Sequence, residues 1–481
     1  MDNQIREQYI PNSFNKDILP TESSARTWKT RDYLTIWMGS VHNIPNYLVV
    51  GGLFALGFSV MQVFSAIMLA AILLALMMVL NGHAGSTYGI PFSIYLRSSF
   101  GEKGSIIIGT LRGVIAATFW FGFQTFAGSQ AMLILIGKIS PSFLTLGGDF
   151  NFFGLTLAQL IAFVIFWLFN IVFIIFGVDL LNRFTNILSI FVYVIFGGMA
   201  IWAVQLAGGI APILNHIPQI AAGNEIILFI AGITAIIASW AAPIVNVSDF
   251  TRFATSTKAQ VVGQSIGLVI TYLLFAFASI AIIVGSEIAY GTPIWNVLDV
   301  VAYFDNYFAI LLAVFTLCLT TLSVNITGNI VPAGYQMAAL FPKKLNFKSG
   351  AFIISILGLI IMPWKWMEEA TSIFTLLNMI GAMLGPVAGV MLAHYFIISK
   401  KKLDILSLYT GEGIYRYYFG FNIQAFFTII LTSLPCLLGQ FIPMLEAFFQ
   451  MSWVVGTGSA FILYILLARL FPQKASNRIH N

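Results

Sequence analysis

The chain has 481 residues, of which 59% are hydrophobic and only 9% are charged. This composition leaves too little polar surface for a water-soluble globule, so it excludes soluble enzymes and soluble binding domains. The net charge of +5 needs no nucleic acid to explain it, because basic residues collect on the cytoplasmic side of membrane proteins. The sequence therefore predicts an all-α polytopic membrane protein whose main surroundings are the lipid bilayer.

Apolar stretches long enough to cross a bilayer recur along the whole chain. Residues 1–31 come first, and they form a polar N-tail that we expect to be loosely ordered and without a cleavable signal peptide. A transmembrane helix needs about 20 apolar residues. We predict twelve such helices, of which the ninth is short: 33–56, 58–80, 113–137, 153–176, 184–207, 226–250, 261–285, 307–338, 350–364, 370–397, 420–443 and 450–471.

The placement of charged residues supports this count. With the N-terminus inside, the tails and even-numbered loops hold all 23 Lys and Arg residues except Lys138 and Lys365. We therefore predict a multi-pass protein of the cell membrane with both termini cytoplasmic. All 18 Asp and Glu residues fall in tails, loops or span ends, with Asp249 closing the sixth span. The usual intramembrane carboxylate of a proton relay is thus missing.

Two prolines interrupt membrane-length apolar runs in matching places. Pro45 follows His42 and Asn43 in the first span, and Pro243 follows Trp240 in the sixth. Helix breaks at membrane depth persist only where the freed backbone groups face protein, a cavity or a ligand. A pair of interrupted helices in two corresponding halves indicates the substrate site of a secondary transporter.

Polar and aromatic residues interrupt two other spans. Trp120 and Gln124 are four residues apart in the third span, hence on one helix face, where an indole and an amide could stack on and hydrogen-bond a flat ring. The eighth span is unusually polar between Thr320 and Asn329. Both patterns also suit ordinary contacts between membrane helices, so the residues alone leave packing and binding open.

Other function classes find little support. The sequence contains no nucleophile–base pair, no metal-ligand spacing, no phosphate-binding loop and no paired carboxylates, so an intramembrane enzyme is a weak alternative. Cys318 and Cys436 lie within apolar spans and are interpreted as packing residues. His83, His216 and His394 are expected to be polar surface residues. No obligatory protein partner and no cofactor is indicated.

Several short motifs occur in order from Arg26 to the last span, and together they resemble the nucleobase:cation symporter-1 family, which includes cytosine, purine, hydantoin and allantoin permeases. The closest likeness is to bacterial allantoin permeases. The motifs are Arg26-Thr27-Trp28, His42-Asn43-Ile44-Pro45, Asn81-Gly82-His83-Ala84-Gly85, Trp120-Phe121-Gly122-Phe123-Gln124-Thr125, Asn246-Val247-Ser248-Asp249, Ser323-Val324-Asn325, Pro363-Trp364-Lys365 and Gly385-Pro386-Val387-Ala388-Gly389.

The resemblance implies a leucine-transporter-like fold with 5+5 inverted repeats and broken helices 1 and 6. After the cytoplasmic N-tail at 1–31, the first five-helix repeat would cover 32–208 and the second 209–398. Residues 399–481 would form a cytoplasmic loop, helices 11 and 12 and the C-tail.

The resemblance also implies a function and a site. The substrate would be a small planar nitrogen heterocycle, allantoin or a related hydantoin, with cytosine, uracil or a purine as the alternative. The positions of Trp120 and Trp240 would enclose the ring, and Asn43, Gln124 and Asn329 would read its amide groups. This agrees with the chemistry of carboxamides, which offer a donor and an acceptor together.

The coupling ion would be Na⁺ or H⁺. Sodium-coupled relatives bind the ion at the positions of Gly39, His42, Thr320 and Ser323, and with a second hydroxyl where this chain has Val324. The lost oxygen predicts weak sodium binding and leaves proton coupling open. His42 could titrate near neutral pH, or its imidazole could be held at the pore by the local backbone without titrating.

Overall fold

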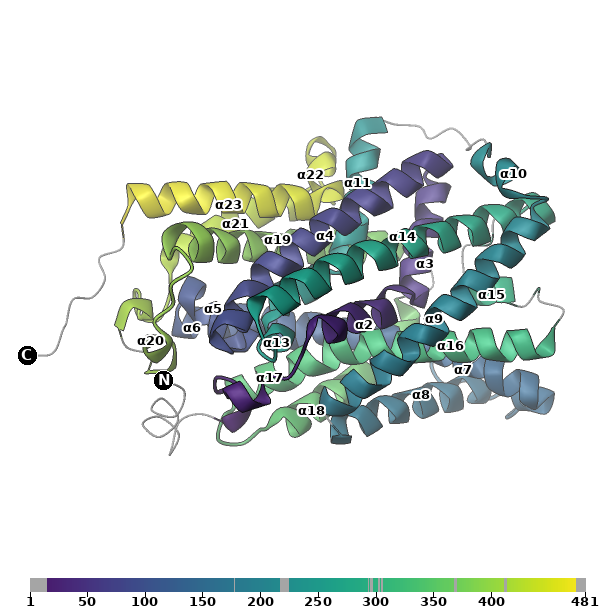
Figure 1. Cartoon of the computed structure of the whole chain (residues 1–481), viewed down its shortest axis with the longest axis horizontal. Coiled ribbons are helices and arrows are strands. Elements are labelled where there is room, and N and C mark those ends of the chain that lie inside the picture. Colours follow the sequence, from purple (N-terminus) through teal and green to yellow (C-terminus); the bar gives the residue numbers. More distant parts are fainter. Residues whose placement is uncertain are drawn as a thin grey trace, which may run out of the picture.

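The computed structural model describes residues 15–176, 178–216, 225–292, 294, 297–301, 303, 306–366, 370–410 and 413–472. The first 14 residues of the predicted N-tail and the predicted C-tail from 473 onward lie outside this part of the chain. Helices form a single bundle in which α4, α14, α16 and α23 run along the long axis, whereas α3 and α11 are steeply inclined to it (Figure 1).

Eight helical rods in the described part of the chain are long and apolar enough to cross a membrane. Three of them contain a π-helical turn, η3, η5 or η7. The rods are α4 (Val60–Tyr88), α6 (Glu102–Thr110) with η3 (Leu111–Ala116) and α7 (Ala117–Ile139), α8 (Leu157–Phe176), α9 (Val178–Leu206), α14 (Thr257–Tyr290), α16 (Tyr307–Asn325) with η5 (Ile326–Ile330) and α17 (Val331–Leu340), α19 (Ala370–Leu392) with η7 (Ala393–Ile398), and α23 (Ser452–Leu470).

The remaining predicted spans are shorter or bent. Helix α21 (Ile423–Leu438) is followed by the segment Pro443–Gln450, which contains η9 (Pro443–Leu445) and α22 (Glu446–Gln450). The two meet at 118° and make a ninth span if the bent pair is counted as one. The predicted first, sixth and ninth spans are helices below spanning length. These are α2 (Thr30–Val41) and α3 (Ile44–Ala55), then α11 (Glu225–Ser239), α12 (Ala241–Asn246) and α13 (Ser248–Thr251), and then α18 (Phe347–Ile360). The count of twelve therefore stays a prediction.

Short helices connect the rods or cap their ends. They are η1 (Lys16–Ile18), η2 (Ser23–Ala25), α5 (Phe92–Phe100), η4 (Pro141–Thr145), α10 (Ile210–Leu214), α15 (Val297–Val301), η6 (Pro363–Lys365), α20 (Ile405–Thr410) and η8 (Gly413–Tyr415).

Small residues allow neighbouring helices to approach closely. On α19, glycines recur every fourth residue on the face that meets α23, where Thr457 donates a hydrogen bond to the Gly385 carbonyl at 3.1 Å. A Cβ atom at Gly381 would lie 2.8 Å from the Ser452 hydroxyl, too close for any larger residue without movement. Membrane helices associate through such contacts because lipid supplies no hydrophobic force between them.

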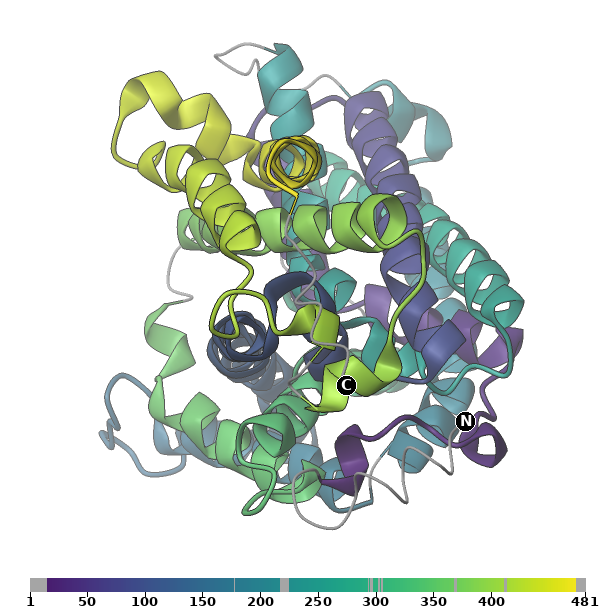
Figure 2. The ribbon, with the colours of Figure 1, turned by 90° about the vertical axis from the view of Figure 1, so that its left-hand side faces the viewer.

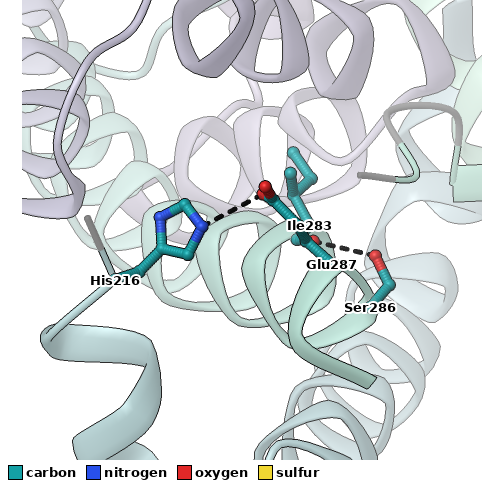
Figure 3. Close-up of polar contacts among 4 residues, drawn as sticks. All are labelled: His216, Ile283, Ser286 and Glu287. Atoms are coloured by element: carbon teal, nitrogen blue, oxygen red, sulfur yellow. Dashed lines mark hydrogen bonds and ion pairs between the residues drawn. The ribbon is translucent and has the colours of Figure 1, made fainter. Parts of the chain in front are cut away.

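An ion pair ties the end of α14 to the segment after α10. His216 Nε2 lies 3.2 Å from Glu287 Oε2, and both side chains are about four-fifths buried (Figure 3). One residue before Glu287, the Ser286 hydroxyl donates back to the Ile283 carbonyl at 2.8 Å within α14. His216 is thus a paired residue and not the isolated surface residue expected from the sequence.

The N-terminal segment from Asn15 to Lys29 is well ordered, contrary to the prediction. It lies toward the left-hand end of the bundle in Figure 1, where α23 also ends. Figure 2 looks onto this end of the bundle. The buried Arg252 donates to the Leu19 carbonyl at 2.7 Å, to the Asp17 carbonyl at 3.0 Å and to the Thr21 hydroxyl at 2.6 Å. Composition could not reveal this order, because the acceptors are mostly backbone carbonyls.

Loss of this anchor should measurably destabilise the protein. Replacing Arg252→Ala leaves three acceptors without their donor and should cost about 3 kcal/mol or more, since hydrogen bonds to charged groups each contribute about 1.5–3 kcal/mol. Thermal unfolding of the purified protein should therefore begin at a lower temperature. The exposed Lys258 on α14 provides the matched control, and equal unfolding temperatures for Arg252→Ala and Lys258→Ala would contradict the anchor.

Candidate functional site

The first break separates α2 from α3 at His42. There Asn43 caps α3, because its side-chain oxygen accepts from the Asn46 amide at 3.2 Å and its Nδ2 donates to the Ser40 carbonyl at 2.8 Å. Asn46 Nδ2 in turn donates to the Val41 carbonyl at 2.7 Å. Two carboxamides thus satisfy the backbone groups that the break frees, which is why the chain can leave the helix here. Asn43 is occupied with this task, which sequence reasoning did not foresee.

The second break lies at Trp240, between α11 and α12. Trp240 is 3% exposed and has non-helical backbone angles, and Pro243 follows within the first turn of α12. The Trp240 indole packs edge-on against Trp37 of α2, with ring centroids 5.7 Å apart, and against Tyr272 of α14, with ring centroids 6.5 Å apart. The two broken helices therefore meet through aromatic side chains.

Helix α7 of the predicted third span and helix α16 with η5 of the predicted eighth span supply the facing wall. Trp120 and Gln124 lie one turn apart on α7, as their spacing predicted. Asn329 lies in the π-helical turn η5, and its Nδ2 donates to Asn325 Oδ1 at 2.9 Å. Asn325 Nδ2 donates to Asn170 Oδ1 and to the Thr125 hydroxyl, both at 3.1 Å. This buried network fixes the amide of Asn329, and π-helical turns in α-helices are frequent at functional sites.

One cavity brings all five predicted substrate-binding residues together. It has a volume of about 30 Å³ and lies between the two breaks, α7, and the end of α16 with η5. Asn46, Ser239 and Val324 also face it, and sequence reasoning assigned none of these three to a substrate site. The predicted residues that line it are Asn43, Trp120, Gln124, Trp240 and Asn329.

The cavity is largely closed and chemically mixed. Trp120 is 8% exposed, Gln124 5% and Asn329 4%. Gln124 Oε1 is buried and has no hydrogen-bond partner among the described residues. A buried acceptor without a partner costs about 1–3 kcal/mol, so a ligand that offers an N–H group here gains that free energy. Two indoles beside such an acceptor suit a flat ring with polar edges.

A buried arginine, which the sequence analysis had placed in a loop, joins the elements around the cavity. Arg112 lies in the π-helical turn η3, is fully buried, and donates through Nη2 to Asn246 Oδ1 at 2.7 Å and to the Gly328 carbonyl at 2.6 Å. Asn246 Nδ2 in turn donates a hydrogen bond to Asp249 Oδ2 at 3.2 Å. The helical rod of the predicted third span begins at Glu102 and not at the predicted residue 113, so a charged residue inside a span was the missed signal.

Asp249 is likewise more enclosed than a span-closing residue at the membrane surface. It is 1% exposed, and its Oδ1 accepts the Phe92 amide at 2.9 Å. With Arg112 and Asn246 it forms a charged network that connects the third, sixth and eighth spans. Such a network holds the end of the interrupted helix in place because its members are buried and the hydrogen bonds between them are directional.

The residues predicted for a cation are distributed over α2 and α16, two helices that pack against each other. Gly39, Thr320 and Ser323 are buried. The hydroxyl oxygens of Ser323 and Thr321 have no hydrogen-bond partner among the described residues, whereas the Thr320 hydroxyl donates to the Leu317 carbonyl at 3.1 Å. Buried neutral oxygens of this kind suit a hard cation such as Na⁺.

The His42 side chain points away from the cavity, which corrects the interpretation of a pore-side histidine. Its ring centroid lies 4.5 Å from that of Phe196 and 5.4 Å from that of Phe275, and Nδ1 is 3.4 Å from the Tyr47 hydroxyl. His42 is not among the residues that line the cavity. Any contribution of His42 to an ion site would therefore come from its backbone carbonyl.

Comparison with known proteins identifies the family. Residues 20–456 match the family model described as permease for cytosine/purines, uracil, thiamine and allantoin. The chain belongs to this permease family. The permease is 50% identical over 467 residues to the putative allantoin permease of Escherichia coli strain K12, covering 96% of each chain, and 45% identical over 459 residues to the allantoin permease of Bacillus subtilis strain 168, covering 95% and 94%.

The fold of the permease is also known from a solved structure. It matches Mhp1, a nucleobase-cation-symport-1 family transporter in a closed conformation with bromovinylhydantoin bound, with a TM-score of 0.78 and 25% identity over 95% of this chain and 96% of that one. The expected transporter architecture of the leucine-transporter type is thus confirmed, and the protein is a multi-pass secondary transporter.

Removal of Arg112 should destabilise the permease strongly. Arg112→Met leaves Asn246 Oδ1 and the Gly328 carbonyl without their charged donor, and breaking a buried charged network in this way costs about 3–5 kcal/mol. Thermal unfolding of the purified protein measures the loss. Lys138→Met, an exposed lysine at the far end of the same rod, should unfold like the unaltered protein; a similar result for Arg112→Met would mean that the arginine is not needed to hold the three spans.

Proposed function

We propose that the permease imports allantoin or a closely related hydantoin by cation-coupled alternating access. The observation that carries this proposal is the buried Gln124 oxygen without a partner, in a cavity that Trp120 and Trp240 also line. The two bacterial relatives named for allantoin and the hydantoin-bound structural relative support the same class of substrate.

The chemistry of the substrate fits the cavity. A hydantoin ring is small and flat and carries alternating N–H and C=O groups, and allantoin adds a ureido arm of the same kind. The ring would lie against the indole faces of Trp120 and Trp240, while an N–H donates to Gln124 Oε1. Asn329 Nδ2 donates one of its two N–H groups to Asn325, so the carbonyl oxygen and the second N–H group of Asn329 are offered to the ligand.

Asn43 has a different role in this proposal. Because its carboxamide caps α3 and bonds Ser40, it would shape the cavity by fixing the break and would contact the substrate only as part of the lining. Gln124 and Asn329 would then be the residues that hydrogen-bond the ring of the substrate directly. This refines the role that family resemblance implies for Asn43.

The coupling ion in this proposal is Na⁺, carried together with the substrate. It would bind between α2 and α16 through the Ser323 hydroxyl and the backbone carbonyls of Gly39, His42 and Thr320, with the Thr321 hydroxyl as a further oxygen. A proton would need a titratable side chain at the cavity, and the described lining residues include no Asp, Glu or His. Both an oxygen-rich ion site and the lack of a proton acceptor favour sodium.

The finer topology completes the proposal. Twelve spans would be arranged as two inverted repeats, 32–208 and 209–398, followed by two further spans in 399–481, with both termini in the cytoplasm. Alternating access would then move the broken helices of one part against the third and eighth spans of the other. The Arg112 network lies across that boundary, because it joins η3 and η5 to α12.

Stacking can be tested at the indole that has the fewest other contacts. Trp120 faces the cavity and contacts Phe123, so Trp120→Ala should abolish or severely reduce allantoin uptake, because aromatic stacking adds about 0.5–1.5 kcal/mol beyond area burial. Uptake of labelled allantoin by cells with equal membrane levels of protein is the measurement. Trp366→Ala, at a residue that is 55% exposed, is the control, and normal uptake by Trp120→Ala would remove this residue from the site.

The role of Gln124 separates binding from folding. Gln124→Leu removes an acceptor that has no partner in the empty protein, so the empty protein should keep or slightly raise its unfolding temperature. Allantoin binding should weaken by about tenfold, because the ligand then loses a buried hydrogen bond. Calorimetric binding and thermal unfolding of the same preparations give both numbers, and a fall in stability with unchanged binding would assign Gln124 to helix packing.

Sodium dependence should be shallow, because Val324 supplies no oxygen where a second hydroxyl would strengthen the site. We expect Val324→Thr to increase the effect of Na⁺ on substrate affinity and Ser323→Ala to abolish it. Linkage requires that substrate change Na⁺ affinity by the same factor, so both titrations on purified protein must agree. Uptake that follows the proton gradient, with no sodium effect in any of the three proteins, would contradict sodium coupling.

A further inference from the structure

A second, larger cavity is lined by residues of η7, η8, α21, α23 and the loops beside them, and Figure 2 looks onto the end of the bundle where α20 lies. It has a volume of about 750 Å³ and lies between the end of η7, the loop that contains η8, and helices α21 and α23. We call it the terminal cavity. Its lining and that of the substrate cavity have no residue in common, so transport of the substrate does not account for it.

The floor of the terminal cavity is a buried chain of hydrogen bonds. Asn422 Nδ2 donates to the Tyr464 hydroxyl at 2.9 Å, and this hydroxyl lies 2.9 Å from His394 Nδ1. On the other side of the ring, His394 Nε2 lies 3.0 Å from the Ser399 hydroxyl. His394 and Tyr464 are 5% and 2% exposed, so His394 is an interior residue and not a polar surface residue as expected.

The order of donors and acceptors in this chain follows from its first member. Asn422 is oriented because its oxygen accepts the Ala425 amide at 3.3 Å, which leaves its Nδ2 as the donor to Tyr464. Tyr464 can then donate its own proton to His394 Nδ1, and the neutral ring donates from Nε2 to Ser399. Ser399 accepts this bond, so its O–H remains as a donor toward the cavity.

One lysine side chain lines the cavity in the part of the chain that the structure describes. Lys402 lines it, and no carboxylate is among the described residues that do so. The neighbouring Lys401 is directed elsewhere, with its ammonium 5.6 Å from the centre of the Phe396 ring. The Asp404 carboxylate lies near the lining residue Tyr415, but it accepts from the Ser407 amide and hydroxyl. A lysine ammonium and a hydroxyl donor at one cavity can together bind an anion.

The rim of the cavity is apolar and aromatic. Ile398, Ile414 and Tyr418 line it and are 37%, 48% and 68% exposed. Aromatic and aliphatic residues at the end of a membrane helix are typical of the interface between hydrocarbon and water. A ligand held here by its anionic group therefore meets a surface suited to hydrocarbon chains.

The backbone around the cavity is strained. Of the six non-glycine residues with positive φ in the described chain, four lie in the two segments that border it: Lys400, Lys401, Tyr417 and Phe419. Left-handed conformations of such residues cost free energy and cluster at binding and switch sites. Two strained turns therefore hold the lysine-bearing segment and the tyrosine-bearing loop beside the polar floor.

We propose that the terminal cavity binds the phosphate group of an anionic phospholipid, with the headgroup on Lys402 and Ser399 and the acyl chains along the apolar rim. Basic pockets between membrane helices on the cytoplasmic side bind such headgroups. The lipid would link α19 to the two peripheral helices α21 and α23. A free phosphate-bearing solute shares the headgroup chemistry but makes no use of the rim.

Native mass spectrometry of the full chain in detergent tests the proposal, with phosphatidylglycerol and phosphatidylcholine as the added lipids. The unaltered protein should retain phosphatidylglycerol preferentially. Lys402→Gln should weaken that retention by about fivefold, the effect of one basic residue near an anionic lipid surface, and Ser399→Ala should also weaken it. The control Lys343→Gln replaces an exposed lysine outside the cavity and should retain the lipid normally.

Three results would overturn the proposal. Equal loss of phosphatidylglycerol in Lys402→Gln and Lys343→Gln would show general attraction to the basic surface. Equal retention of both lipids by the unaltered protein would show no anion selectivity. Displacement of phosphatidylglycerol by inorganic phosphate at millimolar concentration would assign the cavity to a free anion. Unchanged thermal unfolding of Lys402→Gln is expected, because the lysine is exposed, and confirms that the variants compare folded proteins.

Discussion

In lipid, each backbone N–H and C=O group must find a partner within the protein, and the structure around the substrate cavity depends on this constraint. The helices are interrupted at His42 and Trp240, and these breaks leave backbone groups without helical partners in the middle of the bundle. At the first break the carboxamides of Asn43 and Asn46 take over the lost helical bonds. At the second, Trp240 fills the gap between two helices by packing on Trp37. The cavity lies where the backbone is already irregular and already supported by side chains.

Further irregularities belong to the same arrangement. The π-helical turns η3 and η5 each lie opposite a broken helix, and Arg112 binds an atom of η5 and an atom of α12 at once. Both bonds come from the same nitrogen, Nη2 of the buried guanidinium. In the proposed alternating access, movement of the broken helices against the third and eighth spans would break or rearrange the Arg112 bonds, and this network would then contribute to the free-energy difference between the outward-facing and inward-facing states.

The sequence predicted the parts of this site that follow from local spacing. Trp120 and Gln124 share a helix face because they are four residues apart, and the prolines at 45 and 243 marked the two breaks. The sequence could not show that the Asn43 side chain hydrogen-bonds the backbone at the break between α2 and α3, because this depends on where α2 ends. Arg112 was missed because a charge at the edge of an apolar window is assigned to a loop, and its partner Asn246 lies 134 residues away. The order of the N-terminal segment depends likewise on Arg252, more than 200 residues distant.

The most direct test of the account is an experimental structure of the full chain determined with allantoin at saturating concentration. The account predicts density for a flat ligand between the side chains of Trp120 and Trp240, with one of its N–H groups within hydrogen-bonding distance of Gln124 Oε1. Ligand density elsewhere, or density in this cavity with Gln124 turned away and Trp120 and Trp240 not in contact with the ring, would contradict it.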